Sequence, residues 1–279
     1  MTDTPCFSPA VSSHTCRVTE HRWVNGRYRY LRLESDAALA PATRPGQFYQ
    51  LKCPTTDQHQ PFLLRPMSVY GTGPAEGSLE FLYNVTGEGT RALATLAEDA
   101  AMNIVGPLGN TFTLKPHYRH IVLVVRGVGL ATLAPLVRHA AAAGIAITAV
   151  MSARSPADMM QREFLRGIKA AVFCLYDSDG SSAPEAVEAL LVRVIAADPP
   201  DAIYTCGSHR LLMLLQRLLA EHPAIDGEVA MEQRMACGMG VCLSCVRLFD
   251  CDGDQRFLRV CREGPVFPIR QVVGEVEFG

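Results

Sequence analysis

Four cysteines near the end of the chain restrict its fold more than any other feature. Cys237, Cys242 and Cys245 follow the spacing C-x4-C-x2-C, and Cys261 comes after an intervening turn. This pattern is typical of plant-type ligation of a 2Fe-2S cluster by four thiolates. Two glycines stand between the first two cysteines, where side chains would keep the backbone away from the metal. The spacing therefore predicts a tight cysteine loop around two irons, with electron transfer as its chemistry.

Other interpretations of these cysteines stay open. A zinc site usually has a C-x2-C pair on each side of a spacer, whereas the second half here offers Cys261 and a poorly spaced Cys251. Buried thiols or disulfides are the third possibility, although stable disulfides are rare in a reducing compartment. Cys251 lies in the acidic turn at 250–254, which predicts an exposed loop cysteine and not a ligand.

The composition excludes several classes of protein. The 279 residues are 48% hydrophobic and 19% charged, which is enough for ordinary packed cores and for more than one domain. A net charge of -2, without a basic block, gives no reason to expect nucleic acid binding. Residues 1–8 lack the pattern of a secretory signal, and no apolar run is long enough to span a bilayer. The expectation is a cytoplasmic protein without a membrane span.

The hydrophobic pattern divides the chain into three expected domains, a multidomain architecture of α/β and β parts. Residues 1–115 contain short alternating runs, such as 28–33 and 47–52, between Pro and Gly residues, which predicts an antiparallel β-barrel with one helix at 90–99. Residues 116–226 alternate strands and helices, which predicts a doubly wound parallel α/β domain. Residues 227–279 form the expected cluster domain.

The expected elements of the α/β domain are the following. The strands are 121–125, 145–151, 172–176 and 202–206, and the helices are 132–143, 159–167, 184–197 and 209–221.

Two segments of the predicted barrel are candidates for binding a flavin nucleotide. Arg65 and Ser68 begin a predicted strand, where a guanidinium and a hydroxyl could hold a pyrophosphate, although such an arginine is more often solvated. The glycine loop 87–89 leads into the helix at Thr90, and a helix N-terminus after such a loop binds anions. Tyr83 could pack on a flavin ring, or it could simply be a core tyrosine.

A glycine turn after the strand 121–125 is the candidate nucleotide site of the α/β domain. Arg126 precedes Gly127 and Gly129, at the place where a doubly wound sheet binds phosphate. The turn is not a full G-x-G-x-x-G motif, so both glycines could instead serve close packing of strand and helix. Cys206 and Gly207 end a later strand and are expected at the same edge of the sheet.

These motifs, together with the segment 106–109, resemble the ferredoxin reductase-like superfamily. The segments 232–245 and 260–267 look like those of the electron-transfer subunits of bacterial NAD-dependent dihydroorotate dehydrogenase, an enzyme of pyrimidine biosynthesis. The resemblance implies an FAD-binding β-barrel, an NAD-binding α/β domain and a C-terminal 2Fe-2S domain. It further implies a hetero-oligomer in which this chain carries electrons between the flavin of a catalytic dehydrogenase subunit and NAD(P). The sequence offers no separate catalytic Ser/His/Asp or Cys/His set.

Carried over by position, the resemblance implies three sets of binding residues. FAD would be held by Arg65, Pro66, Met67, Ser68, Leu82, Tyr83, Asn84, Gly89 and Thr90, NAD(P) by Gly127, Gly129, Cys206 and Gly207, and the irons by Cys237, Cys242, Cys245 and Cys261.

Three positions depart from the family pattern. Arg126 stands for a glycine, Thr132 for a proline and Ser208 for a proline, and all three are expected in the nicotinamide half, away from FAD and cluster. Arg126 could meet a 2'-phosphate or another anion, or its bulk could close the pocket. The alternatives are the same electron-transfer module serving a different dehydrogenase, or a redox-sensing protein without nucleotide turnover.

Overall fold

A computed structural model describes residues 11–73, 77–160 and 162–273 of the chain. The segment 1–8, for which the sequence predicts no secretory signal, lies outside the described residues. So does residue 161 of the helix expected at 159–167.

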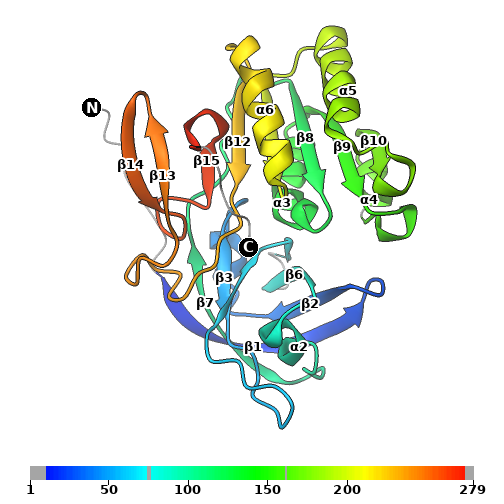
Figure 1. Ribbon diagram of the computed structural model, residues 1–279. Helices are drawn as coiled ribbons and strands as arrows, with labels where there is room; N and C mark the ends of the chain where they lie inside the picture. Colours follow the sequence, from blue (N-terminus) through cyan, green and yellow to red (C-terminus); the bar gives the residue numbers. More distant parts are fainter. Residues whose placement is uncertain (1–10, 74–76, 161, 274–279) are drawn as a thin grey trace.

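The N-terminal half of the protein forms one curled antiparallel sheet of seven strands (Figure 1). The strand order is β4-β3-β7-β1-β2-β6-β5, so segments far apart in sequence are neighbours. The curled sheet confirms the antiparallel barrel predicted from the alternating pattern. Its elements are β1 (Ser12–Trp23), β2 (Tyr28–Glu34), α1 (Leu39–Ala42), β3 (Phe48–Leu51), β4 (Arg65–Ser68), β5 (Gly71–Gly73), β6 (Ser78–Asn84), α2 (Glu88–Leu93) and β7 (Ala101–Leu108).

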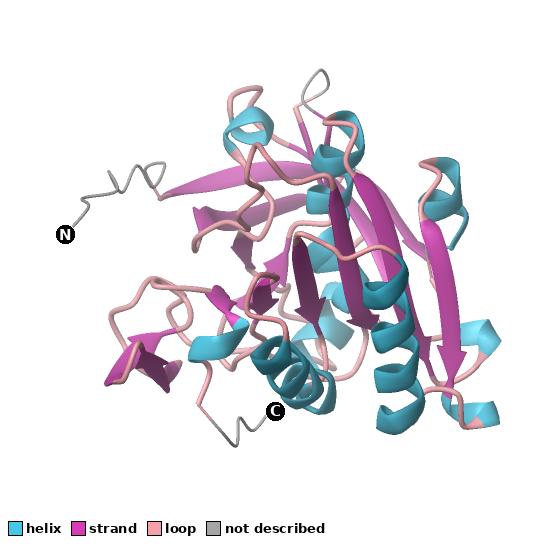
Figure 2. Ribbon diagram, turned by 90° about the horizontal axis from the view of Figure 1, so that it is seen from above, coloured by secondary structure: helices cyan, strands magenta, loops and turns pink. Residues whose placement is uncertain are grey.

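The second half forms a six-stranded sheet of order β10-β9-β8-β11-β12-β15, parallel except for β15. Figure 2 shows helices on both sides of this sheet, as predicted for a doubly wound α/β fold. Its elements are β8 (His120–Arg126), α3 (Gly129–Ala142), β9 (Ala146–Ala153), α4 (Arg162–Gly167), β10 (Ala171–Tyr176), α5 (Pro184–Ala197), β11 (Ala202–Cys206), α6 (His209–Glu221), β12 (Asp226–Ala230) and β15 (Val266–Pro268), with short 3-10 helices at Pro156–Asp158, Asp177–Asp179 and Ile269–Gln271.

Alternation along β8 explains why this sheet is covered on both faces. Val122 and Val124 belong to the core shared with α5 and α6, whereas Leu123 and Val125 belong to the core shared with α3. Successive side chains of a strand point to opposite faces, so an uninterrupted apolar strand requires helices on both sides.

Two expected helices differ from the observed ones. The helix expected at 90–99 is α2, which ends at Leu93, because the chain must turn back to pair Asp99 N–H with the Val18 carbonyl oxygen at 2.8 Å. The helix expected at 159–167 is replaced by a 3-10 turn that begins at Pro156 and by the shorter α4.

The C-terminal segment joins the two sheets. A hairpin of β13 (Val246–Cys251) and β14 (Asp254–Arg259) lies beside the α/β sheet (Figure 1), and β15 then pairs with β12. The predicted boundary at 226/227 falls inside β12, so the limits of the three domains stay a prediction.

Asn110 ties the curled sheet to this C-terminal segment. Its Nδ2 donates to the carbonyl oxygens of Glu263 and Val266, both at 2.9 Å, and its Oδ1 accepts from Val266 N–H at 3.0 Å. Its own N–H donates to the Gly264 carbonyl at 2.6 Å. Four hydrogen bonds therefore hold the end of the barrel against the strand β15.

No helix within residues 11–73, 77–160 and 162–273 is long and apolar enough to cross a membrane.

We predict that Asn110→Ala lowers the free energy of unfolding by about 1–3 kcal/mol, because three side-chain hydrogen bonds between two parts of the fold are lost. Asn103→Ala is the matched control: this asparagine on β7 accepts one side-chain bond, from Thr15 at 2.8 Å, and should cost less than about 1 kcal/mol. Urea unfolding measures both values, and equal losses would show that Asn110 does not hold the C-terminal segment.

Candidate functional site

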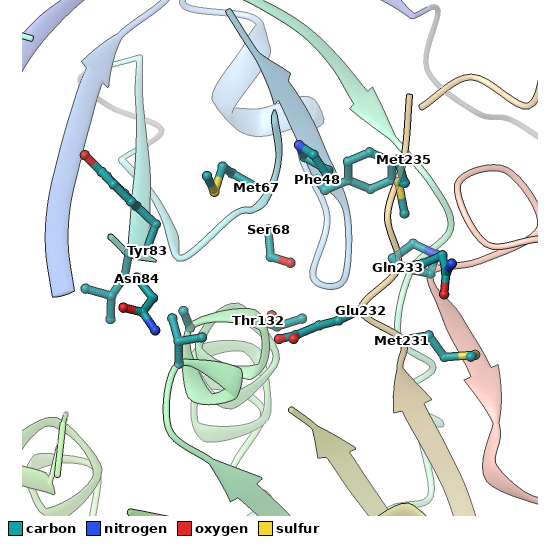
Figure 3. Close-up of a pocket in the computed structure, with 15 residues that line it drawn as sticks. Phe48, Met67, Ser68, Tyr83, Asn84, Thr132, Met231, Glu232, Gln233 and Met235 are labelled. Carbon is teal, nitrogen blue, oxygen red and sulfur yellow. The ribbon is translucent and has the colours of Figure 1, made fainter. Parts of the chain in front are cut away.

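A cavity lies where the curled sheet, α3 and the segment after β12 meet (Figure 3). It encloses about 820 Å³, part of which is open to solvent. Apolar walls with a few polar groups are typical of a cofactor site. The lining residues are Phe48, Pro66, Met67, Ser68, Leu82, Tyr83, Asn84, Val128, Ala131, Thr132, Met231, Glu232, Gln233, Met235 and Pro265.

Six residues that were predicted to bind a flavin line this cavity. They are Pro66, Met67 and Ser68 on β4, and Leu82, Tyr83 and Asn84 on β6. In the sheet, β4 pairs with β3, whereas β6 lies between β2 and β5. The curl of the sheet brings β4 and β6 together in one wall of the cavity. The sequence thus pointed to both strands, but it could not show that they form one wall of a cavity.

Tyr83 is both a core residue and a cavity residue. Its hydroxyl is hydrogen-bonded to His21 Nε2 at 2.8 Å, and His21 Nδ1 lies 2.9 Å from the Leu96 carbonyl oxygen. In Figure 3 the Tyr83 hydroxyl points away from Met67 and Ser68. Burial raises the pKa of Tyr83 and lowers the pKa of His21. Both groups are therefore neutral at physiological pH, and the ring is fixed in the wall of the cavity.

The other three predicted flavin residues meet outside the cavity wall. The guanidinium of Arg65 packs on Gly89, where an added Cβ would lie 2.2 Å from Arg65 Nε, so a larger residue at this position would displace the guanidinium. Thr90 Oγ1 accepts the N–H groups of Thr86 and Gly87 at 3.0 Å each and so forms the start of α2. Arg65, Gly89 and Thr90 thus form one polar corner beside the cavity.

Glu232 is a cavity residue that the motif analysis did not single out. It lines the first cavity and a second one next to it, and Figure 3 shows its carboxyl group pointing inward near Thr132. The cavities leave Glu232 accessible, yet protein atoms enclose it closely, and this desolvation raises the pKa of its carboxyl group. Its Oε1 lies 4.0 Å from Cys206 Sγ. The sequence signal that could have identified Glu232 was its position in the segment 232–245, which resembles the family.

Thr132, one of the three positions that depart from the family pattern, lies in the wall of the first cavity. It does not line the second cavity. Thr132 belongs to the α/β half of the chain, as expected, but its side of α3 faces the curled sheet, so it shares this first cavity with the residues predicted to bind FAD.

The second cavity lies at the carboxyl edge of the parallel sheet and has a volume of about 630 Å³, part of which is open solvent. Ligands of open α/β sheets bind at this edge. It is lined by Arg27, Tyr28, Arg126, Gly127, Val128, Ala153, Arg154, Asp158, Gly207 and Glu232. Among the described residues, Arg27 and Arg154 form no ion pair, and Asp158 lines the same cavity.

The predicted nucleotide residues separate into two groups. Gly127 and Gly207 line the second cavity, and both have positive φ, 54° and 91°. Gly129 does not line it: an added Cβ would lie 2.4 Å from the Cys206 carbonyl oxygen, so this glycine allows β11 to pack on α3. Cys206 is buried behind that contact. The structure thus favours the packing interpretation for Gly129 and Cys206.

Arg126, the second departure, is held by an acidic residue. Its Nη1 and Nη2 donate to the two carboxylate oxygens of Asp177 at 3.0 and 2.6 Å. The Arg126 hydrogen bonds, with a further one from Ser182, lower the pKa of Asp177 to about 2. The third departure, Ser208, caps α6 by accepting Leu211 N–H at 3.4 Å. The Arg126–Asp177 pair therefore links the end of β8 to the end of β10, and Asp177 neutralises the charge of Arg126.

Three of the predicted ligand cysteines lie in the loop before β13 and Cys261 follows β14, and backbone N–H···S hydrogen bonds link the four into two pairs. Cys237 Sγ accepts the N–H of Cys242 at 3.4 Å, and Cys245 Sγ accepts the N–H of Cys261 at 3.5 Å. Within the described residues, no three His, Cys, Asp or Glu side chains converge on a single ion. Two pairs of thiols fit two irons with two thiolates each, as in a 2Fe-2S cluster.

The backbone of this loop suits an iron-sulfur cluster. The N–H groups of Met239 and Gly240 donate to the sulfurs of Cys237 and Cys261 at 3.4 and 3.1 Å. Gly238 and Gly240 have positive φ, 71° and 81°, a conformation that glycine adopts readily and that allows the tight turns of this loop. Amides directed at sulfur stabilise the negative charge of thiolates and sulfides.

The environments of the thiols differ along the loop. Hydrogen bonds from Ser244 are the main reason that the pKa of Cys242 falls to about 6, which favours the ligating thiolate at the exposed end. Burial raises the pKa of Cys261 to about 12, and metal coordination would remove that proton. Cys251 was expected to be exposed, but it ends β13 half-buried against the core that contains Phe249, because the hairpin folds onto that core.

Comparison with known proteins agrees with this geometry. Residues 232–273 match the family model described as the iron-sulfur cluster binding domain of dihydroorotate dehydrogenase B. The dihydroorotate dehydrogenase B (NAD(+)) electron transfer subunit of Desulforamulus reducens is 33% identical over 245 residues, which is 87% of this chain and 92% of that protein. The subunit of the same name from Enterococcus faecalis is 32% identical over 238 residues, 83% of this chain and 87% of that protein.

Solved structures share the fold. One is described as an NADH-dependent reduced ferredoxin-NADP oxidoreductase of flavin-based electron bifurcation. It has a TM-score of 0.74 at 22% identity and covers 92% of this chain and 89% of that one. The ferredoxin reductase in carbazole 1,9a-dioxygenase has a TM-score of 0.61 at 19% identity, over 78% of this chain and 69% of that one.

The Arg126–Asp177 pair predicts a specific pH dependence. Because the folded-state pKa of Asp177 lies below its ordinary value of 3.8, the pair stabilises the fold above about pH 4, and this contribution disappears as the pH falls through 2. With 39% of the Asp177 side chain exposed, Asp177→Asn should cost about 1 kcal/mol or less at pH 7. The double variant Arg126→Gln/Asp177→Asn should cost no more than the single one; additive losses at pH 7 would contradict the pairing.

The two pairs of thiols predict which cysteines matter for the cluster. Serine at position 237, 242, 245 or 261 should remove most of the iron, acid-labile sulfide and visible absorption, because each position supplies one of four ligands. Cys251→Ser is the matched control and should retain all three. Colourless wild-type protein with one bound zinc would contradict the assignment.

Proposed function

The chain belongs to the family of electron transfer subunits of NAD-dependent dihydroorotate dehydrogenase B, and from this membership we propose its function. It carries electrons between the flavin of a catalytic dehydrogenase subunit and NAD(P), through a 2Fe-2S cluster and FAD. The observation that best supports this is one short segment: Met231 and Met235 line the first cavity, and Cys237 opens the cluster loop two residues later. A flavin and a cluster bound there are direct neighbours.

FAD fits the first cavity and the polar corner beside it. When bound, FAD links hydride chemistry, which moves electron pairs, to the one-electron chemistry of the cluster. The walls from β4 and β6 would hold the flavin ring, with Ser68 and Asn84 as its polar contacts. Arg65, with Gly89 and Thr90 at the start of α2, binds the pyrophosphate through a guanidinium and free backbone amides.

NAD(P) fits the second cavity. Arg27 and Arg154 offer two unpaired guanidinium groups to a dinucleotide, whose diphosphate is anionic. Gly127 and Gly207 expose backbone at the same place, whereas Gly129 and Cys206 support the turn from behind. Arg126 is already neutralised by Asp177, so Arg126 orders the edge of the site and leaves phosphate binding to Arg154 and Arg27.

Glu232 lies at the boundary of both cavities. Because desolvation raises its pKa, its carboxyl group keeps a proton at a higher pH than an ordinary glutamate. We assign it to hold a proton, and to exclude water, where flavin and nicotinamide meet. Ser68 and Thr132 are the hydroxyl groups next to it in the cavity wall (Figure 3).

The cluster loop supplies the surface for the catalytic subunit. Val241 and Leu243 are 79% and 59% exposed, on either side of the exposed ligand Cys242. Exposed apolar side chains at a redox centre mark a protein interface. Docking there gives a hetero-oligomer in which electrons enter or leave at Cys242. We place the complex in the cytoplasm, where thiols stay reduced.

The decisive experiment uses this chain co-expressed with the dihydroorotate-oxidising subunit from the same host. The flavin- and iron-replete complex should reduce NAD(P) when dihydroorotate is added. Val241→Asp should lower this coupled rate at least tenfold by weakening docking, while NADH still bleaches the flavin of the isolated chain. Phe257→Asp, a 75% exposed residue on β14, is the matched control and should leave the coupled rate unchanged.

Two results would contradict the proposal in different ways. Flavin bleaching by NADH or NADPH without dihydroorotate-dependent turnover would assign the module to another dehydrogenase. Absence of bleaching in the loaded chain would identify a redox sensor without nucleotide turnover.

A further inference from the structure

Gln50 is a fully buried amide in the middle of β3. Along this strand Tyr49 and Leu51 face the core of the curled sheet, whereas Phe48 packs in the core that contains Cys245 and Cys261. Side chains two residues apart share one face of a strand. Gln50 therefore points to the same side as Phe48, toward the cysteine loop.

The amide of Gln50 has no hydrogen-bond partner. Neither Nε2 nor Oε1 is paired within the described residues, although the side chain is 0% exposed. An unsatisfied buried amide is costly, so such a group in a native protein calls for a partner. The residues of the first cavity do not include Gln50, which separates its amide from the flavin.

The amide lies directly against the cluster loop. A Cβ added to Gly238 would lie 2.5 Å from Gln50 Nε2 and 2.8 Å from its Cγ. Gly238 follows the ligand Cys237, whose sulfur already accepts the N–H groups of Met239 and Cys242. A glycine is required at 238 both by its φ of 71° and by the Gln50 side chain packed on it.

We propose that Gln50 donates a hydrogen bond from its side-chain amide to a sulfur of the iron-sulfur cluster on the Cys237 side. This inference rests on the proposed function, because it requires the cluster. Gln50 is then a positioning residue that links the flavin-binding sheet to the cluster and sets the reduction potential of the cluster. A donor toward sulfur stabilises the reduced cluster, which has the greater negative charge, and so raises the potential.

The test compares Gln50→Leu with Tyr49→Phe in the full chain loaded with FAD and cluster. Redox titration followed by electron paramagnetic resonance measures the cluster potential. Gln50→Leu should shift the ratio of reduced to oxidised cluster about tenfold toward the oxidised form, or about 59 mV for one electron. Tyr49→Phe also removes a buried polar group of β3, one that bonds Thr43 on the opposite face, and should leave the potential unchanged.

A second readout separates this role from simple packing. In the cluster-free chain, Gln50→Leu should be as stable as the wild type or more stable, because the orphaned amide is gone. Gln50→Met, an unbranched side chain of similar size, should repeat the potential shift if the leucine variant folds poorly. An unchanged cluster potential, or a shift confined to the flavin, would overturn the inference. Failure of the proposed function would appear earlier, as wild-type chain without iron and sulfide.

Discussion

The C-terminal segment around Pro265 is the contact on which the rest of the structure depends. Asn110 binds it from the curled sheet through four hydrogen bonds, and Met231 N–H, at the end of the parallel sheet, donates to the Pro265 carbonyl at 2.9 Å. Pro265 also lines the first cavity. One stretch of backbone thus fixes both sheets and the cluster loop relative to one another, and rigid elements hold redox centres at a constant separation.

This arrangement explains how two kinds of electron chemistry share one chain. Glu232 lies between the two cavities, whereas Met235 lies between the first cavity and the cysteines. The second cavity is lined by charged residues of both signs, while Phe48 and the core of Phe249 pack beside the cysteines. Burial strengthens the hydrogen bonds to the sulfurs of Cys245 and Cys261, because the local dielectric constant is low there, whereas the bonds to Cys237 lie at the exposed end of the loop.

Much of the fold could be predicted from local patterns. The helices at 184–197 and 209–221 and the strand at 202–206 have the predicted bounds, because apolar periodicity and turn residues are local properties. The cavity residues on β4 and β6 were also predicted. Glu232 and Gln50 were not, because a single polar residue has no periodicity, and only burial among distant neighbours makes it informative. The sequence predicted an exposed Cys251 because its neighbours are typical of an exposed turn, whereas the folded hairpin leaves it half-buried.

Strand alternation was sufficient for the fold class and cysteine spacing for the prediction of an iron-sulfur domain, since both depend on residues close together in the chain. The tertiary structure alone decided which groups are neighbours across long sequence separations. It paired Arg126 with Asp177, used Gly129 for packing, placed Thr132 in the wall of the first cavity, and set Gln50 against Gly238. These contacts arise because one sheet curls and packs against the other. Such packing depends on residues far apart in the chain, so no local sequence pattern predicts it.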